Sequence, residues 1–223
     1  MENIRKMNVL VLGNSGAGKS TLINLIPRFY DATKGEILVD GINVKQYDQE
    51  TLNNKIAVVA QKAVLFKGDI KSNIIYGSNK NIADDDERIL DALEISKADF
   101  VLQLDNGIHA SVAQGGTNFS GGQKQRLSIA RAVFKDSEII IFDDSFSALD
   151  YKTDMQVRQK IKEKLSDKTI IIVAQRIGTI KNADKILVIE DGKIIGEGKH
   201  ETLIETCPVY KEIALSQLSK EEL

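Results

Sequence analysis

Residues 8–20, "NVLVLGNSGAGKS", are the most informative part of this sequence for the fold. Residues 8–13, "NVLVLG", are a short run of β-branched residues and leucine that ends in glycine, which predicts a buried β-strand, and a helix is predicted from about Lys19 to Phe29. Between them, "GNSGAGKS" matches the whole pattern G-x-x-x-x-G-K-[ST] of a phosphate-binding loop. Its glycines allow successive backbone N–H groups to point at one anion, and the following helix offers its positive end. A strand before the loop and a helix after it argue against an accidental glycine-rich turn.

The loop predicts a site for a nucleoside triphosphate. Lys19 is expected to reach the β- and γ-phosphates, and Ser20 is expected to ligate Mg²⁺. The residues expected to contact the nucleotide are Gly13, Asn14, Ser15, Gly16, Ala17, Gly18, Lys19, Ser20 and Thr21.

A second apolar run ends in acid. In "IIIFDDSFSALD", residues 139–150, a strand of isoleucines and phenylalanine is followed by Asp143 and Asp144. Asp143 could cap the loop after the strand. Because a phosphate loop precedes it in the chain, we expect it to hold Mg²⁺, through water, next to Ser20.

The remaining pattern alternates strands with helices. Strands are predicted at 35–41, 55–61, 138–142, 169–174 and 185–190, the last followed by a second strand through Asp191-Gly192. Helices are predicted over most of 69–118, with a solvated acidic start at 84–88, over 120–134 with Ser120 as the N-cap, and over 200–218. This order predicts an α/β fold with a mainly parallel sheet covered on both faces.

Composition narrows the class further. The 223 residues carry 30 basic and 32 acidic side chains, a net charge of −2, which gives no sign of a nucleic-acid partner, although a local basic patch is compatible with it. No apolar run approaches the roughly 18 residues of a membrane span, and the N-terminus lacks a signal-peptide layout. A single cysteine, Cys207, excludes an internal disulfide and fits a reducing cytoplasm.

Several further motifs resemble the nucleotide-binding domain of ATP-binding cassette (ABC) transporters. They are "NFSGGQKQRLSIARAVF" (118–134), Gln61 in "VVAQKAVLF", "SALD" (147–150) and "VAQRIGTI" (173–180). Their order and spacing match from about residue 8 to 218. The stretches "FYDATKGEILVDG", "LFKGDIKSNIIYG" and "HETLIETCPVYKEIALSQL" resemble the exporter branch.

The resemblance implies a P-loop NTPase with a helical subdomain and an incomplete antiparallel β-subdomain. It assigns 1–65 and 135–223 to a RecA-like core and about 66–134 to the helical subdomain. It also implies that two such domains pair head to tail around two ATP molecules, so that Ser120, Gly121, Gly122 and Gln123 contact the partner's ATP.

The remaining family positions carry further implied roles. Gln61 would meet Mg²⁺ and couple to an exporter's membrane domain. Ser147 and Asp150 would lie across the dimer seam. The domain would work at the cytoplasmic face of the cell membrane.

Two residues depart from the family pattern. Asp144 stands where the family has a glutamate that orients or deprotonates the attacking water, and Gln175 stands where it has a histidine. Aspartate is one methylene shorter, and neutral glutamine supplies neither charge nor general acid–base catalysis. With Gln61, these form the predicted catalytic set. We expect slow hydrolysis at this chain's own site, and a different partner chain with the intact glutamate and histidine.

The start of the chain also departs from the family. Only 12 residues precede Gly13, and the first aromatic residue is Phe29. The family has a longer upstream segment whose aromatic residue stacks on adenine, so we expect weakened ATP binding. The sequence is therefore expected to be a truncated or excised piece of a longer half-transporter.

Two other functions compete with the exporter ATPase. One is a soluble ABC ATPase of DNA repair or translation, but such proteins usually carry two cassettes or a long coiled-coil insertion. The other is a GTP-binding switch, which needs N-K-x-D; "NADK" at 182–185 has the wrong order. The motifs do not identify a transported substrate.

Overall fold

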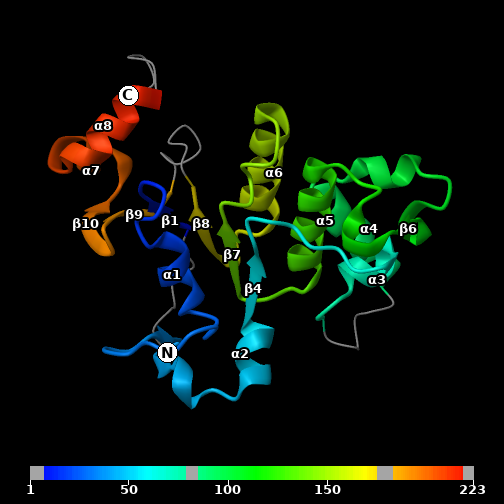
Figure 1. Cartoon of the computed structure of the whole chain (residues 1–223), viewed down its shortest axis with the longest axis horizontal. Coiled ribbons are helices and arrows are strands. Elements are labelled where there is room, and N and C mark those ends of the chain that lie inside the picture. Colours follow the sequence, from blue (N-terminus) through cyan, green and yellow to red (C-terminus); the bar gives the residue numbers. More distant parts are fainter. Residues whose placement is uncertain (1–7, 79–84, 175–182, 218–223) are drawn as a thin grey trace. The chain divides into compact units, whose positions relative to one another are not determined.

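The structure is a computed structural model, and it describes residues 8–78, 85–174 and 183–217 (Figure 1). The chain divides into two compact units. The first unit comprises Met1–Leu52, Ile141–Asp144 and Thr169–Leu223, and the second comprises Asn53–Ile140 and Ser145–Lys168.

The first unit contains most of a mixed β-sheet. Its strands are β1 (Asn8–Leu12), β8 (Thr169–Val173), β9 (Lys185–Glu190), β10 (Lys193–Gly198) and the last residues of β7 (Ile139–Asp143). The order is β10, β9, β1, β8 and β7. Strand β1 pairs in parallel with β8 and β9, and β10 is antiparallel to β9. The central strand β1 is apolar after Asn8, and its last three residues are buried, as is typical of parallel strands within a sheet.

The helix after the phosphate loop is shorter than predicted. Helix α1 spans Lys19–Asn24 rather than reaching Phe29. Beyond it the backbone continues in turns, and Arg28 has φ 58°. Pro27 explains the early end, because proline lacks an N–H donor and disfavours helical geometry in the residue before it.

The predicted strand at 35–41 is reduced to a small hairpin. Strands β2 (Leu38–Val39) and β3 (Ile42–Asn43) pair antiparallel, and the 3₁₀ turn η1 (Val44–Gln46) follows. Asp40 and Gly41, with φ of 53° and 75°, make the connection. Helix α2 (Gln49–Lys55) then leads into the second unit.

The C-terminal part of the first unit packs on its sheet. Asp191 and Gly192, with φ of 47° and 73°, form the predicted two-residue turn between β9 and β10. The predicted helix at 200–218 is two helices, α7 (His200–Thr206) and α8 (Pro208–Gln217). The break falls at Cys207, because Pro208 has no N–H with which to continue α7.

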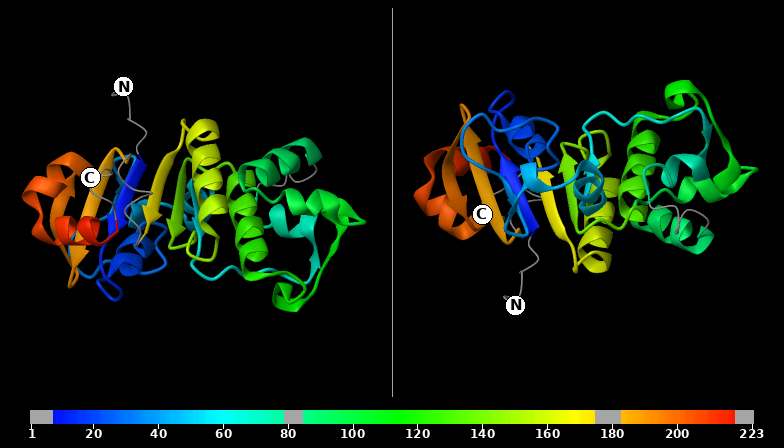
Figure 2. Two further views of the ribbon diagram at one scale, coloured as in Figure 1. Left: turned by 90° about the horizontal axis from the view of Figure 1, so that it is seen from above. Right: turned by 90° about the horizontal axis from the view of Figure 1, so that it is seen from below.

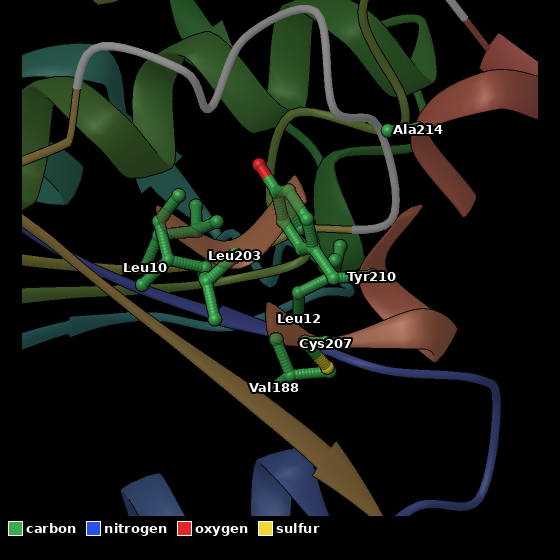
Figure 3. Close-up of a cluster of buried hydrophobic side chains, with 9 residues drawn as sticks. Leu10, Leu12, Val188, Leu203, Cys207, Tyr210 and Ala214 are labelled. Carbon is green, nitrogen blue, oxygen red and sulfur yellow. The ribbon is translucent and has the colours of Figure 1, made fainter. Parts of the chain in front are cut away.

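These two helices bury an apolar cluster against β1 and β9 (Figure 3). Its labelled members are Leu10, Leu12, Val188, Leu203, Cys207, Tyr210 and Ala214. Inside it, the Tyr210 hydroxyl lies 2.8 Å from His200 Nδ1. Burial raises the pKa of Tyr210 to about 12. The free thiol of Cys207 is buried as part of this packing.

The second unit is mainly helical. Its helices are α3 (Ile70–Ile74), α4 (Asp86–Ile95), α5 (Gly121–Phe134) and α6 (Tyr151–Lys164). Strand β4 (Ile56–Val59) lies next to β7. Helix α5 packs against α3 and α4 (Figure 2). The acidic run begins α4 as predicted, with Asp85 as its N-cap.

The prediction of helix over most of 69–118 is only partly confirmed. Short 3₁₀ turns occupy Asp99–Gln103, Gly107–His109 and Gln114–Gly116. Strands β5 (Gly68–Asp69) and β6 (Ser111–Val112) pair antiparallel. Positive φ at Gly107, Gly115 and Gly116 explains why no long helix forms there.

Candidate nucleotide-binding site

The phosphate loop of residues 13–20 connects β1 to α1 within the first unit. Gly16 and Gly18 have φ of 81° and 96°, which side chains with a Cβ atom rarely adopt. Gly13 is required for a different reason. A Cβ atom there would lie 2.2 Å from the carbonyl oxygen of Ile189 in β9. The loop therefore depends on glycine for its shape and for its close packing on the sheet.

Lys19 lies over the phosphate loop. Its Nζ donates hydrogen bonds to the carbonyl oxygens of Gly13 at 2.8 Å and Asn14 at 2.7 Å. Desolvation lowers the pKa of Lys19, and the nearby charges of Asp144 and Asp143 oppose that shift. Because Lys19 as a residue is only 8% exposed, its ammonium group gains from an anion placed beside it. The residues of the loop therefore fit a phosphate group.

Ser20 and Asp143 meet at the start of α1. The Ser20 Oγ donates a hydrogen bond of 2.8 Å to Oδ1 of Asp143, which ends β7. The two residues are 123 positions apart in sequence, and the structure brings them together as predicted. Both offer hard oxygen ligands, which Mg²⁺ prefers. In the described residues there is no cluster of three or more potential metal ligands among His, Cys, Asp and Glu. A two-ligand Mg²⁺ site still fits, because Mg²⁺ usually keeps several waters and binds substrate phosphates.

Asp144 adopts a left-handed backbone conformation, with φ 46°. Its N–H donates a 3.1 Å hydrogen bond to the carbonyl oxygen of Val173, the last residue of β8. Asp144 therefore lies at the carboxyl end of the sheet, close enough to Lys19 for its charge to act on it. The second predicted catalytic residue, Gln175, lies outside the described residues.

The second unit holds Ser120, Gly121, Gly122 and Gln123, here called the signature stretch, at the start of α5. Ser120 is the N-cap, as predicted: its Oγ accepts a hydrogen bond of 3.2 Å from Gln123 N. In return, the Gln123 side chain accepts one of 2.9 Å from Ser120 N. This capping box leaves Ser120 and Gly121 exposed at the positive end of a 14-residue helix.

Two more predicted positions lie in the second unit. Gln61 is exposed, and the residue before it is held in place because Gln125 donates a 3.1 Å hydrogen bond to the Ala60 carbonyl oxygen. Asp150 caps α6 through a 3.0 Å hydrogen bond from Thr153 N.

Arg126 lies beside the signature stretch but was not among the predicted site residues. Its guanidinium donates a 2.7 Å hydrogen bond to the Lys97 carbonyl oxygen and stacks 4.9 Å from the Phe100 ring centroid. Desolvation lowers its pKa, while Asp150 and Asp99 act against that shift. Arg126 Nε also donates a 3.4 Å hydrogen bond to the Gly122 carbonyl oxygen. The sequence offered one signal for this contact, because Arg126 stands one helical turn after Gly122.

The first unit thus has the phosphate loop, lysine and serine–aspartate pair that define a P-loop nucleotide-binding α/β domain. A family model described as ABC transporter matches residues 4–147. The chain therefore belongs to the ABC transporter family, whose ATP-binding domains are P-loop ATPases.

Individual relatives agree with this assignment. The chain is 47% identical over 207 residues to an uncharacterized ABC transporter ATP-binding protein of Mycobacterium tuberculosis, covering 93% of this chain and 35% of that protein. It is 41% identical over 219 residues to an ATP-dependent lipid A-core flippase of Wigglesworthia glossinidia brevipalpis, covering 95% of this chain and 36% of the flippase.

A solved structure of a bacterial Atm1-family ABC exporter with ATP bound is similar at a TM-score of 0.90 and 34% identity. The match covers 97% of this chain and 38% of the exporter chain. This chain therefore spans little more than a third of the length of these relatives. Among the helices of the described residues, none has the length and apolar character needed to cross a membrane.

Proposed function

We propose that this chain is the ATP-binding domain of an ABC exporter, and that it couples Mg-ATP binding in a head-to-tail dimer to transport by a membrane domain. The observation that carries the proposal is the hydrogen bond between Ser20 and Asp143 beside the Lys19 ammonium. It joins a phosphate site to a metal site at the carboxyl end of one sheet. The likeness to a lipid A-core flippase and an Atm1-family exporter supports the exporter branch over a soluble ABC ATPase.

In this proposal the binding residues divide the charge of the nucleotide among them. The N–H groups of residues 13–20 and Lys19 bind the phosphates. Ser20, Asp143 and Gln61 hold Mg²⁺, which neutralises developing charge on the phosphates when it is bound. Lys19 exchanges its hydrogen bonds to backbone carbonyl groups for stronger, charge-assisted bonds to phosphate.

The site's own hydrolysis is proposed to be slow. Asp144 takes the place of the glutamate that would orient the attacking water, and its carboxylate falls about 1 Å or more short of that water. Gln175 takes the place of a histidine and cannot carry a charge. The same chain keeps an intact signature stretch at Ser120. This asymmetry supports a heterodimer in which Ser120, Gly121, Gly122 and Gln123 complete the site of a different, competent partner chain.

The remaining assignments follow from the same proposal. The partner domain supplies the intact glutamate and histidine, and an exporter's transmembrane domain places both at the cytoplasmic face of the membrane. Within this chain, 1–65 and 135–223 form the RecA-like core and about 66–134 form the helical subdomain.

The experiment separates binding from turnover. The purified chain is expected to bind Mg-ATP, measured by calorimetry, and to release little phosphate over the same period. Lys19→Ala is expected to abolish binding, because it removes the cation that faces the phosphates. Fast phosphate release by the chain alone, lost in Lys19→Ala, would contradict the degenerate site. An absence of Mg-ATP binding would contradict the proposed function.

A further inference from the structure

The loop of residues 145–150 in the second unit, "SFSALD", follows Asp144 directly and leads into α6. Phe146 and Leu149 are buried, whereas Ser147 and Ala148 are exposed. The Leu149 N–H donates a 3.0 Å hydrogen bond to the Phe146 carbonyl oxygen, which closes the turn. The loop therefore anchors itself by apolar side chains and turns two small residues outward.

Arg158 covers the ring of Phe146. Its Cζ lies 4.1 Å from the ring centroid, closer than in any other cation–π pair of the described residues. The ring is only 3% exposed, and a cation over a desolvated aromatic face is held more strongly than one in water.

Asp154 fixes the guanidinium in turn. It lies one turn earlier on α6, is 1% exposed, and forms an ion pair with Arg158 Nε. Because α6 is also capped by Asp150, the loop is held at both ends by the same helix. An arginine in this arrangement is fixed in orientation rather than free to sample solvent.

The loop lies beside the signature stretch. A Cβ atom built on Gly122 would be 3.4 Å from the Ala148 carbonyl oxygen. The carboxylate of Asp150 is also near enough to act on the charge of Arg126 in α5. The loop and the first turn of α5 therefore lie side by side at Ala148 and Gly122.

We infer that Arg158 is a positioning residue: stacked on Phe146 and held by Asp154, it keeps residues 145–150 beside the signature turn. Ser147 and Ser120 are then presented together to the partner domain's nucleotide. This inference rests on the proposed function, because it assumes that the signature stretch acts on a partner's site.

The first experiment tests, without any partner domain, whether Arg158 holds the loop of residues 145–150 in place. Arg158→Lys keeps a charge for Asp154 but removes the planar group from Phe146. We expect the Leu149 amide to exchange its hydrogen about fivefold faster, measured by NMR. The matched control is Arg88→Lys, since Arg88 also stacks on a ring, Phe134, at 5.6 Å. Equal exchange rates of the Leu149 amide in the wild type and in Arg158→Lys would contradict the positioning role of Arg158.

The ring provides a second test of the same contact. Phe146→Leu keeps an apolar anchor but removes the aromatic face. Combining it with Arg158→Lys should speed the exchange no more than either change alone, because both remove one interaction. Fully additive effects would mean that Arg158 and Phe146 act on the loop independently.

The final experiment measures turnover in the complex with the partner domain that co-purifies with this chain. Arg158→Lys is expected to lower kcat about fivefold with KM unchanged, whereas Arg88→Lys changes neither. Ser120→Leu is expected to abolish turnover. If Ser120→Leu abolishes it but Arg158→Lys leaves kcat unchanged, the inference fails and the proposed function stands. If Ser120→Leu itself has no effect on turnover, both the proposed function and the inference that rests on it fail.

Discussion

Single residues set the chemistry of the phosphate site. Lys19 and Ser20 occupy the positions that the loop pattern predicts, and Asp143 meets Ser20 through a 2.8 Å hydrogen bond. Asp144 departs from the family pattern by one methylene. Its φ of 46° suits an aspartate, because short polar side chains tolerate the left-handed region better than most others. The residue therefore suits its backbone conformation, and in the proposed function its shorter side chain is what slows hydrolysis.

The first residue-scale prediction concerns restored hydrolysis. Asp144→Glu together with Gln175→His is expected to raise ATP turnover by about 100-fold, because a misplacement of about 1 Å costs roughly that factor. Phosphate release at saturating Mg-ATP measures it. Asp144→Asn with Gln175→His is the control and should stay inactive. A double variant that binds Mg-ATP and forms dimers but stays inactive would show that the defect lies elsewhere.

The second residue-scale prediction concerns stability. Gly13→Ala would place a Cβ atom 2.2 Å from the Ile189 carbonyl oxygen, so backbone must move. We expect it to lower the free energy of unfolding by about 3 kcal/mol. Urea denaturation measures this loss. Gly121→Ala is the control, since a Cβ atom there meets nothing within 4 Å, and it should change stability by no more than about 1 kcal/mol. A Gly13→Ala variant as stable as the wild type would contradict the close packing.

At the scale of elements, capping side chains define where several helices begin. Capping boxes begin α3 at Asp69 and α5 at Ser120, and an aspartate caps α6. Each cap satisfies backbone N–H groups that have no partner within the helix. In α5 and α6 these caps also shape the motif segments, so local stability and the proposed function depend on the same residues.

The element-scale prediction concerns pH. Hydrogen bonds from the Thr153 backbone and hydroxyl lower the pKa of Asp150 below its ordinary 3.8. The unfolded chain therefore takes up this proton first as pH falls. The stabilisation by the ionised cap is complete above about pH 5 and is lost as pH falls through 3.8 and below. Asp150→Asn keeps an acceptor without the charge, so its unfolding free energy should fall less steeply between pH 5 and 3 in denaturant titrations. Glu205→Gln, on the exposed surface of α7, controls for the lost charge. If the unfolding free energies of the wild type and Asp150→Asn changed in parallel with pH, the ionised Asp150 cap would not be the cause of the loss.

At the scale of the whole molecule, the motifs fall into two groups. The phosphate loop and Asp143 belong to the first unit, whereas Gln61 and the signature stretch belong to the second. In the proposed function each ATP is bound by the phosphate loop and Asp143 of one chain and by the signature stretch of a second chain. One chain by itself then offers two half-sites rather than one complete site.

The whole-molecule prediction follows from these half-sites. In the variant Asp144→Glu with Gln175→His, two copies of the chain can complete each other's sites. Turnover per molecule should therefore rise with protein concentration until dimers dominate. Adding Ser120→Leu should abolish this activity without changing Mg-ATP binding by the monomer. Turnover per molecule that is independent of concentration would mean that one chain hydrolyses ATP unaided.

The local structures could be predicted from the amino-acid sequence. The strand, loop and helix around Lys19, the cap at Ser120 and the turn at Asp191-Gly192 follow from residue types that permit few backbone conformations. Predictions from the sequence were less accurate where several short-range preferences compete. Examples are the early end of α1 and the 3₁₀ turns after α4.

The contacts between segments that are distant in sequence became known from the folded structure. It placed β1 between β8 and β9, set Gly13 against Ile189, and laid Arg158 over Phe146. The physical reason is that such contacts depend on how apolar faces pack, and many pairings satisfy the same local pattern. Ser20 and Asp143 could be paired in advance only because a known motif links them, since nothing in either residue's own neighbourhood specifies the other.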